Sequence, residues 1–200
     1  MISFPPPSTV DATPFPFAAE DPDRLGMVSV DVDVTVGVHR EWREVAHHRF
    51  VLAKADGVGS YVTGHRGPAG ERHQPEFEAL LGGELGRQHR DHRATYAELV
   101  LDQPLRRGEA QVLEWRWLFT GCHRTAHRYR GHLRAGVHSL GTRLTFHPDA
   151  LPVRVRHTWQ PDPASCPETV RTVAVDRTGL VELLVPEPRP GWHSFHWDWE

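Results

Sequence analysis

The strongest structural signal in the sequence is an alternation of valine with polar residues near the start of the chain. From Val28 to Val38 every second residue is valine, and the residues between them are serine, aspartate, threonine or glycine. A period of two places side chains alternately on the two faces of an extended strand, and β-branched residues favour that conformation. The segment therefore predicts a half-buried β-strand whose polar face carries Asp31 and Asp33.

Further short runs predict an all-β chain, folded as an antiparallel β-sandwich with one or two short helices. Pro75–Gly82 has proline at its start, acids in its first turn and glycine at its end, which predicts a helix. Arg40–Ala46 fits either a helical turn or a second strand, and Asp56-Gly57 predicts a turn. The last expected strand should pair with the one before it. Strands are expected at 50–55, 96–101, 112–119, 129–137, 140–146, 153–159, 169–175, 180–185 and 192–199.

The chain is expected to divide into a proline-rich tail, residues 1–26, and a single β-sandwich domain, residues 27–200. Proline removes backbone donors and disfavours helix and sheet, so the tail predicts an extended, mobile arm. The alternative is that Phe4, Phe15 or Phe17 docks on the domain.

Composition indicates a genome and a compartment more than an activity. Of the 23 Lys and Arg residues only Lys54 is lysine, and there is no asparagine, which is typical of a GC-rich bacterial genome. The net charge of −3 argues against wholesale binding of nucleic acid or anionic lipid. No run reaches the ~18–20 apolar residues of a membrane span, and we expect no secretory signal, because the N-terminal residues include neither a basic nor an apolar segment of that kind. With only Cys122 and Cys166, we expect a cytoplasmic protein without disulfides.

The 15 histidines raise the question of a metal site. A zinc site needs ligands that converge on one point, whereas residues three apart on a strand point to opposite faces. We therefore assign no catalytic, cofactor-binding or metal-binding residue, and expect no cofactor. A metal-dependent enzyme built on clustered histidines stays as an alternative. The local clusters are His47-His48, His89 with His92, His123 with His127, and His193 with His196.

A basic stretch from Arg124 to Arg134 is the candidate interaction surface. Its arginines are interleaved with Tyr129, a pattern that can follow a phosphate backbone, so nucleic-acid binding is a further alternative. A charged outer face or a protected sheet edge explains the same pattern, and we favour it over direct DNA binding. The tryptophans that alternate along the expected strands predict core positions. The candidate basic surface comprises Arg124, Arg128, Arg130 and Arg134.

Three stretches in the second half, 98–109, 146–155 and 190–199, occur in an order that resembles the C-terminal β domain of actinobacterial XRE-type helix-turn-helix regulators. That resemblance implies an effector-sensing or partner-binding role. No helix-turn-helix fits before Val28, so DNA binding is not carried over. The leading hypothesis is a non-enzymatic regulatory or binding module for a protein partner or a small molecule.

Overall fold

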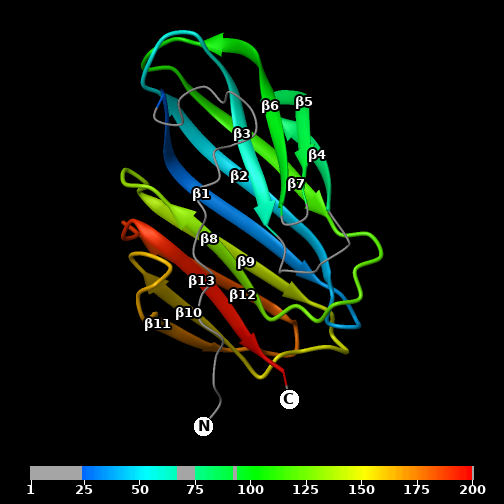
Figure 1. Ribbon diagram of the computed structural model, residues 1–200. Coiled ribbons are helices and arrows are strands. Elements are labelled where there is room, and N and C mark those ends of the chain that lie inside the picture. The colour runs from blue at the N-terminus through cyan, green and yellow to red at the C-terminus, as the bar shows by residue number, and fades with distance from the viewer. Residues whose placement is uncertain (1–23, 67–74, 92–93, 200) are drawn as a thin grey trace.

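The computed structural model describes residues 24–66, 75–91 and 94–199, and this part of the chain is all-β, with thirteen strands in three sheets (Figure 1). The fold class expected from the sequence is therefore confirmed. Residues 1–23 of the predicted tail and His92 lie outside the described residues, and the last two residues of that tail, Leu25 and Gly26, belong to the first strand. The strands are β1 Leu25–Val36, β2 Trp42–Ala53, β3 Val58–Arg66, β4 Glu76–Leu81, β5 Gly83–Arg90, β6 Ala94–Leu105, β7 Ala110–Leu118, β8 Arg128–Leu133, β9 Ser139–Phe146, β10 Arg154–Gln160, β11 Glu168–Ala174, β12 Leu180–Pro186 and β13 Gly191–Asp198.

A six-stranded sheet in the order β12-β9-β1-β2-β7-β4 forms the base of the molecule. Two smaller sheets accompany it, β3-β6-β5 and β11-β10-β13-β8, and occupy different ends of the view in Figure 1. Strands β3 and β8 are edge strands of these smaller sheets. One hydrophobic core contains residues of all three sheets, so the small sheets and the base share a single interior.

Strand β1 confirms the valine pattern. Val30 and Val36, with the two alternating valines between them, are each 1% exposed, and Asp31 is exposed. A register shift between Met27 and Ser29 leaves Val28 only half-buried. Val38 lies beyond the strand end and is exposed, so the alternation outlasts the strand by one valine.

The predicted helix at Pro75–Gly82 is wrong, because β4 occupies most of it. Phe77 of β4 faces Trp117 of β7 in the sheet register and its ring meets the indole edge-on at 4.9 Å. Six residues form too short a helix to be stable alone, whereas pairing with β7 satisfies their backbone. Gly82, at φ 83°, makes the turn into β5 that the pattern had marked as a helix end.

Pairing between distant strands also departs from the expectation. The last strand, β13, pairs with β10 and β8, whereas β12 pairs with β9, so the predicted pairing of the final two strands is wrong. The sandwich is not purely antiparallel, because β1 and β9 run parallel. Residues 42–53 form one continuous strand, which settles the open choice at Arg40–Ala46 in favour of a strand from Trp42 onward.

The expected core tryptophans are confirmed. Trp115, Trp117 and Trp197 are at most 2% exposed, and Trp199 is half-buried. The indoles of Trp197 and Trp199 both donate to the carbonyl of Ala126 at 2.7 Å, which fastens the β7–β8 loop to the last strand. Among the described residues no helix is long and apolar enough to cross a membrane.

Candidate functional site

Two polar side chains stand in the middle of the apolar inner face of the six-stranded sheet. On β2 the inward positions run Val45, His47, Arg49 and Val51, because alternate residues share a face. Across the strands, His47 lies between Val32 and Trp115 in the register. Polar groups at such positions require specific partners, since burial removes their water.

His47 and Arg49 interact with each other and with one indole. Arg49 Nη2 lies 3.1 Å from His47 Nδ1. A guanidinium only donates, so Nδ1 accepts and the imidazole proton resides on Nε2. The His47 ring stacks on Trp115 at 5.0 Å between centroids, and the Arg49 guanidinium lies 5.8 Å from the same ring system. Burial, followed by the positive charge of Arg49, holds the pKa of His47 well below its ordinary value, so this imidazole is neutral.

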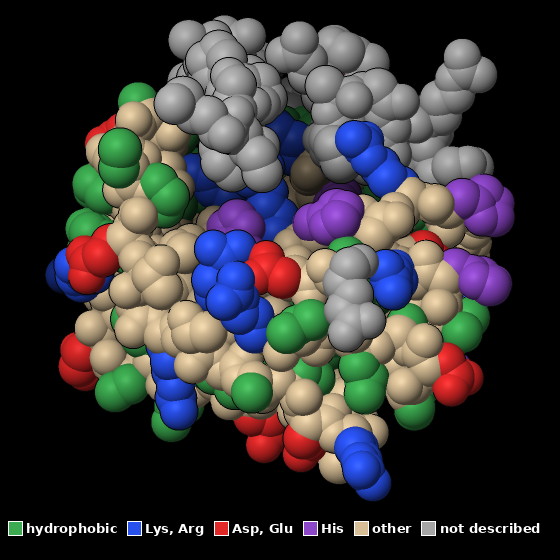
Figure 2. Space-filling model, turned by 90° about the horizontal axis from the view of Figure 1, so that it is seen from below, with side chains coloured by type: hydrophobic (Ala, Val, Ile, Leu, Met, Phe, Trp, Pro, Cys, Tyr) green, Lys and Arg blue, Asp and Glu red, His purple; other side chains and the backbone are tan. Residues whose placement is uncertain are grey.

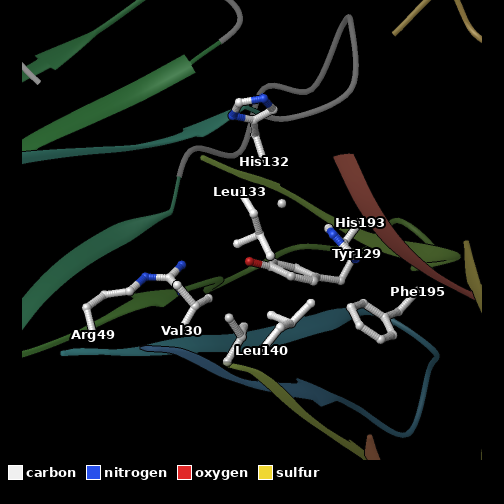
Figure 3. A pocket seen from close by; sticks show the side chains of 10 residues that line it. Val30, Arg49, Tyr129, His132, Leu133, Leu140, His193 and Phe195 are labelled. Atoms are coloured by element: carbon white, nitrogen blue, oxygen red, sulfur yellow. The ribbon is translucent and has the colours of Figure 1, made fainter. Parts of the chain in front are cut away.

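Each small sheet contributes a tyrosine to the same place. Tyr61 of β3 packs on Trp115 at 5.3 Å, and Tyr129 of β8 lies 6.4 Å from the His47 ring. Burial raises the pKa of both phenols, and the charge of Arg49 partly opposes that rise. In Figure 3 the Tyr129 hydroxyl and the Arg49 guanidinium point toward one another. Both tyrosines therefore present protonated hydroxyls near a cation.

A small cavity opens beside Arg49 between β1, β8, β9 and β13. Its volume is about 40 Å³, room for roughly three waters at ~10–15 Å³ each. Its lining combines apolar side chains with the polar side chains of Arg49, Tyr129, His132 and His193 (Figure 3). The apolar lining comprises Val30, Val32, Leu133, Leu140 and Phe195.

The site holds more hydrogen-bond donors than the protein satisfies. Arg49 Nε and Nη1 and Trp115 Nε1 are shielded from solvent and have no hydrogen-bond partner among the described residues, although the Arg49 guanidinium as a whole also hydrogen-bonds to the side chains of Tyr61 and Tyr129 and thereby lowers the pKa of both phenols. The charges that act on the pKa values of His47, Tyr61 and Tyr129 come from basic groups and from the other tyrosine, with no described carboxylate among them. Figure 2 shows a face of the molecule on which Lys, Arg and His side chains gather around a hollow. The interior is thus rich in donors and positively charged.

A buried histidine pair closes one end of the cavity. His193 Nε2 lies 2.9 Å from the Arg189 carbonyl, which can only accept, so His193 carries its proton on Nε2. His157 Nε2 then donates to His193 Nδ1 at 3.0 Å, and the ring of His157 stacks on Phe195 at 4.7 Å. Burial lowers the pKa of both histidines, to about 4 for His157. Both rings are neutral, and their chain of hydrogen bonds orients the wall next to the cavity.

The four arginines of the candidate basic surface do not form one strand face. Arg128 and Arg130 lie on the outer side of β8, Arg124 is exposed in the preceding loop, and Arg134 follows the strand end. The charge of Arg134 acts on Tyr61, which lowers the pKa of that phenol against the effect of burial. Arg134 therefore belongs to the surroundings of the cavity, and Arg128 and Arg130 to the opposite side of their sheet.

The histidine clusters separate in the structure. His193 is buried and His196 lies on the other side of β13, as the strand period predicts. His47 faces the interior, whereas His48 faces outward between Asp33 and Glu114. In residues 24–66, 75–91 and 94–199, no three His, Cys, Asp or Glu side chains are placed to hold a metal ion.

Sequence reasoning missed the roles of His47, Arg49 and Tyr61. The available signal was the parity of β2: once 42–53 is one strand, the positions in phase with Val45 and Val51 include His47 and Arg49. An expected break between Ala46 and Phe50 hid that phase. Tyr129 was assigned correctly to the face opposite Arg128 and Arg130.

Comparisons with known proteins add little to this picture. No family model and no characterised protein matches the sequence. Among solved structures, the chain is similar to an M1 zinc metallopeptidase from Deinococcus radiodurans, with 16% identity, a TM-score of 0.41, and coverage of 86% of this chain and 42% of that chain. A mutant of the two-domain M1 zinc metallopeptidase bound to L-tryptophan gives 15% identity, a TM-score of 0.41 and the same coverage. This chain spans about two fifths of their length, and similarity at this level supports no inference about fold or activity.

Proposed function

We propose that this protein is a non-enzymatic, effector-binding module whose cavity takes a small organic carboxylate. The observation that carries the proposal is the set of unpartnered, solvent-shielded donors at Arg49 and Trp115 beside an apolar cavity. A guanidinium in a protein stays charged, and a buried charge without an anion is costly. A bound anion supplies the missing acceptor.

The chemistry of the lining selects a carboxylate with a short apolar chain. The planar guanidinium fork matches a carboxylate in two parallel hydrogen bonds, and the protonated Tyr129 hydroxyl adds a third donor. Val30, Leu133 and Leu140 then receive an aliphatic tail. A volume of about 40 Å³ restricts the occupant to the smallest carboxylic acids, with acetate the best match and propionate the upper limit.

The protonation states favour binding over chemistry. Tyr61 and Tyr129 hold their protons because burial raises their pKa, and His47 stays neutral with Nδ1 engaged by Arg49. General acid–base catalysis works best with groups that titrate near neutral pH. A regulatory role agrees with the resemblance to the β domain of XRE-type regulators, and places the module as a sensor that reports ligand binding to a protein partner.

Calorimetric titration with acetate, propionate and butyrate tests the proposal. We expect saturable binding of at least one acid to the parent protein and at least a tenfold loss of affinity in Arg49→Gln, which removes the cation. Arg143→Gln is the matched control, because Arg143 lies on β9 and pairs with Glu182 away from the cavity. Absence of binding by any of the three acids, or equal binding by Arg49→Gln, would contradict the proposal.

A further inference from the structure

The outer side of the four-stranded sheet carries a second, separate concentration of positive charge. Successive outward positions on β8 are Arg128, Arg130 and His132, and those on β10 include Arg154 and Arg156. Strand β13 lies between them and presents Trp192, Ser194, His196 and Asp198. We call these residues the basic face.

The basic face contains four arginines and one carboxylate, that of Asp198, which binds two of them. Asp198 accepts from Arg154 Nε at 2.7 Å and from Arg156 Nη2 at 2.8 Å. Arg130 lies over the Trp192 ring at 4.2 Å. The nearby charges of Arg128, Arg156 and Arg130 add to burial in lowering the pKa of His196 to about 4, against a smaller opposite effect of Asp198.

Several donors of the basic face are shielded from water and have no partner. Arg130 Nε and Nη2 and Arg156 Nε are inaccessible to solvent and lack hydrogen bonds among the described residues. Burial also lowers the pKa of Arg130, followed by the charge of Arg128. Shielded guanidinium donors call for an occupant that brings acceptors.

The sequence that precedes the described chain has the complementary chemistry. Residues 1–23 contain no lysine or arginine, and their ionisable side chains are Asp11, Glu20, Asp21 and Asp23. They also carry Phe4, Phe15 and Phe17, which suit an exposed indole.

The described chain begins at Arg24, whose carbonyl accepts from the Lys54 amide at the end of β2, and it then runs along β1 toward the connection that follows β8. Within the first residues of β1, the Val28 carbonyl accepts from the His138 amide at 2.8 Å, in the connection that follows β8. Leu133 at the end of β8 faces Gly191 at the start of β13, next to Trp192. At ~3.3–3.6 Å per residue, 23 residues reach about 75 Å when extended, far more than the length of a strand of eight residues.

We propose that the basic face binds residues 1–23 of the same chain. Acidic side chains of this segment supply acceptors to Arg130 and Arg156, and a phenylalanine packs on Trp192. Tethering raises the effective concentration of the segment to the millimolar range, so weak individual contacts suffice. The segment then acts as a built-in competitor for any acidic partner of this face, instead of the free arm that its proline content predicts.

A double-mutant cycle on the full-length chain tests the contact. One variant neutralises the segment with Asp11→Asn, Glu20→Gln, Asp21→Asn and Asp23→Asn; the other neutralises the face with Arg130→Gln and Arg156→Gln. Each variant alone removes the same interaction, so combining the two removes it only once. We therefore expect the melting temperature of the combined variant to fall by less than the sum of the two separate decreases. The non-additivity should vanish in 1 M salt. Arg143→Gln in place of the face variant should give additive shifts.

Proteolysis and dilution distinguish the possible occupants. Chymotrypsin should cleave after Phe17, which alanine follows, several-fold faster in the segment-neutralised variant than in the parent. Non-additivity that disappears on tenfold dilution would mean that the face binds the segment of a second copy, and would overturn the proposal of binding within one chain. Additive melting shifts at low salt, or equal cleavage rates, would overturn it entirely.

Discussion

At the scale of single residues, the protein buries a charged side chain, Arg49, which lowers its stability and which its fold does not require. Arg49 occupies an inward position between Val30 and Leu113, where an aliphatic side chain would complete the apolar row. Its partners are neutral: His47 Nδ1 accepts from it, and the side chains of Tyr61 and Tyr129 hydrogen-bond to it. A residue that destabilises the unliganded protein at a cavity is a mark of function, because natural sequences depart from consistent packing chiefly at functional sites.

Neutral buried histidines predict a loss of stability on mild acidification. The pKa values of His65, His157 and His196 lie at about 4, lowered mainly by burial from 6.5. Above pH 6.5 both native and unfolded rings are neutral; between pH 6.5 and 4 the unfolded chain binds more protons, so stability falls as the pH falls. Discounted for partial exposure, the loss from pH 7.5 to 5 is on the order of 3 kcal/mol.

Urea unfolding at pH 7.5 and pH 5 measures this loss. His65→Phe should reduce it, because the ring packs edge-on against Phe119 and phenylalanine keeps that contact without titrating. His127→Phe serves as the control, since His127 is exposed, and should leave the pH dependence unchanged. Equal stability of the parent at the two pH values would contradict this account, because it would show that these rings take up protons in the native state as readily as in the unfolded chain.

At the scale of secondary-structure elements, the sequence predicted best those strands whose local pattern agrees with their environment. Strand β1 has one face in the core, and the alternation of valine with polar residues indicates which face that is. Strand β4 carries local helix signals that pairing with β7 overrides. Two inward positions of β2 are the polar residues His47 and Arg49 of the candidate site, and they break the hydrophobic period of the strand. The parallel pairing of β1 with β9 joins residues about 110 apart, which no local pattern specifies.

Substitution in β1 tests its assigned face. Val34 is 1% exposed and lies between Leu144 and Val45 in the sheet register. Val34→Asp buries a carboxylate without a partner, and we expect a loss of about 3 kcal/mol or more in the free energy of unfolding. Thr145→Asp, at an exposed position of β9, should change it by less than ~0.5 kcal/mol. Denaturant titration of both variants checks the pair, and equal midpoints would refute the assignment.

At the scale of the whole molecule, the candidate site exists because three sheets meet. The base contributes His47, Arg49 and Trp115, while edge strands of the two small sheets bring Tyr61 and Tyr129 toward them. No sequence pattern announces such a meeting point, since its residues come from four strands whose order in space is not their order in the chain. The strand content was predictable from the sequence. The convergence of hydrogen-bond donors around one cavity was not, because it depends on the order of the strands in space.

The central claim is that Arg49 is kept for an anion at the expense of stability, and melting with and without propionate tests it most directly. Arg49→Met replaces the cation by an apolar chain of similar length, so the unliganded variant should melt ~2–4 °C above the parent, which corresponds to about 1 kcal/mol. Saturating propionate, at about 100 times its dissociation constant, should raise the melting temperature of the parent by roughly 5–10 °C and leave that of Arg49→Met unchanged. A variant that melts below the parent and still responds to propionate would contradict the account.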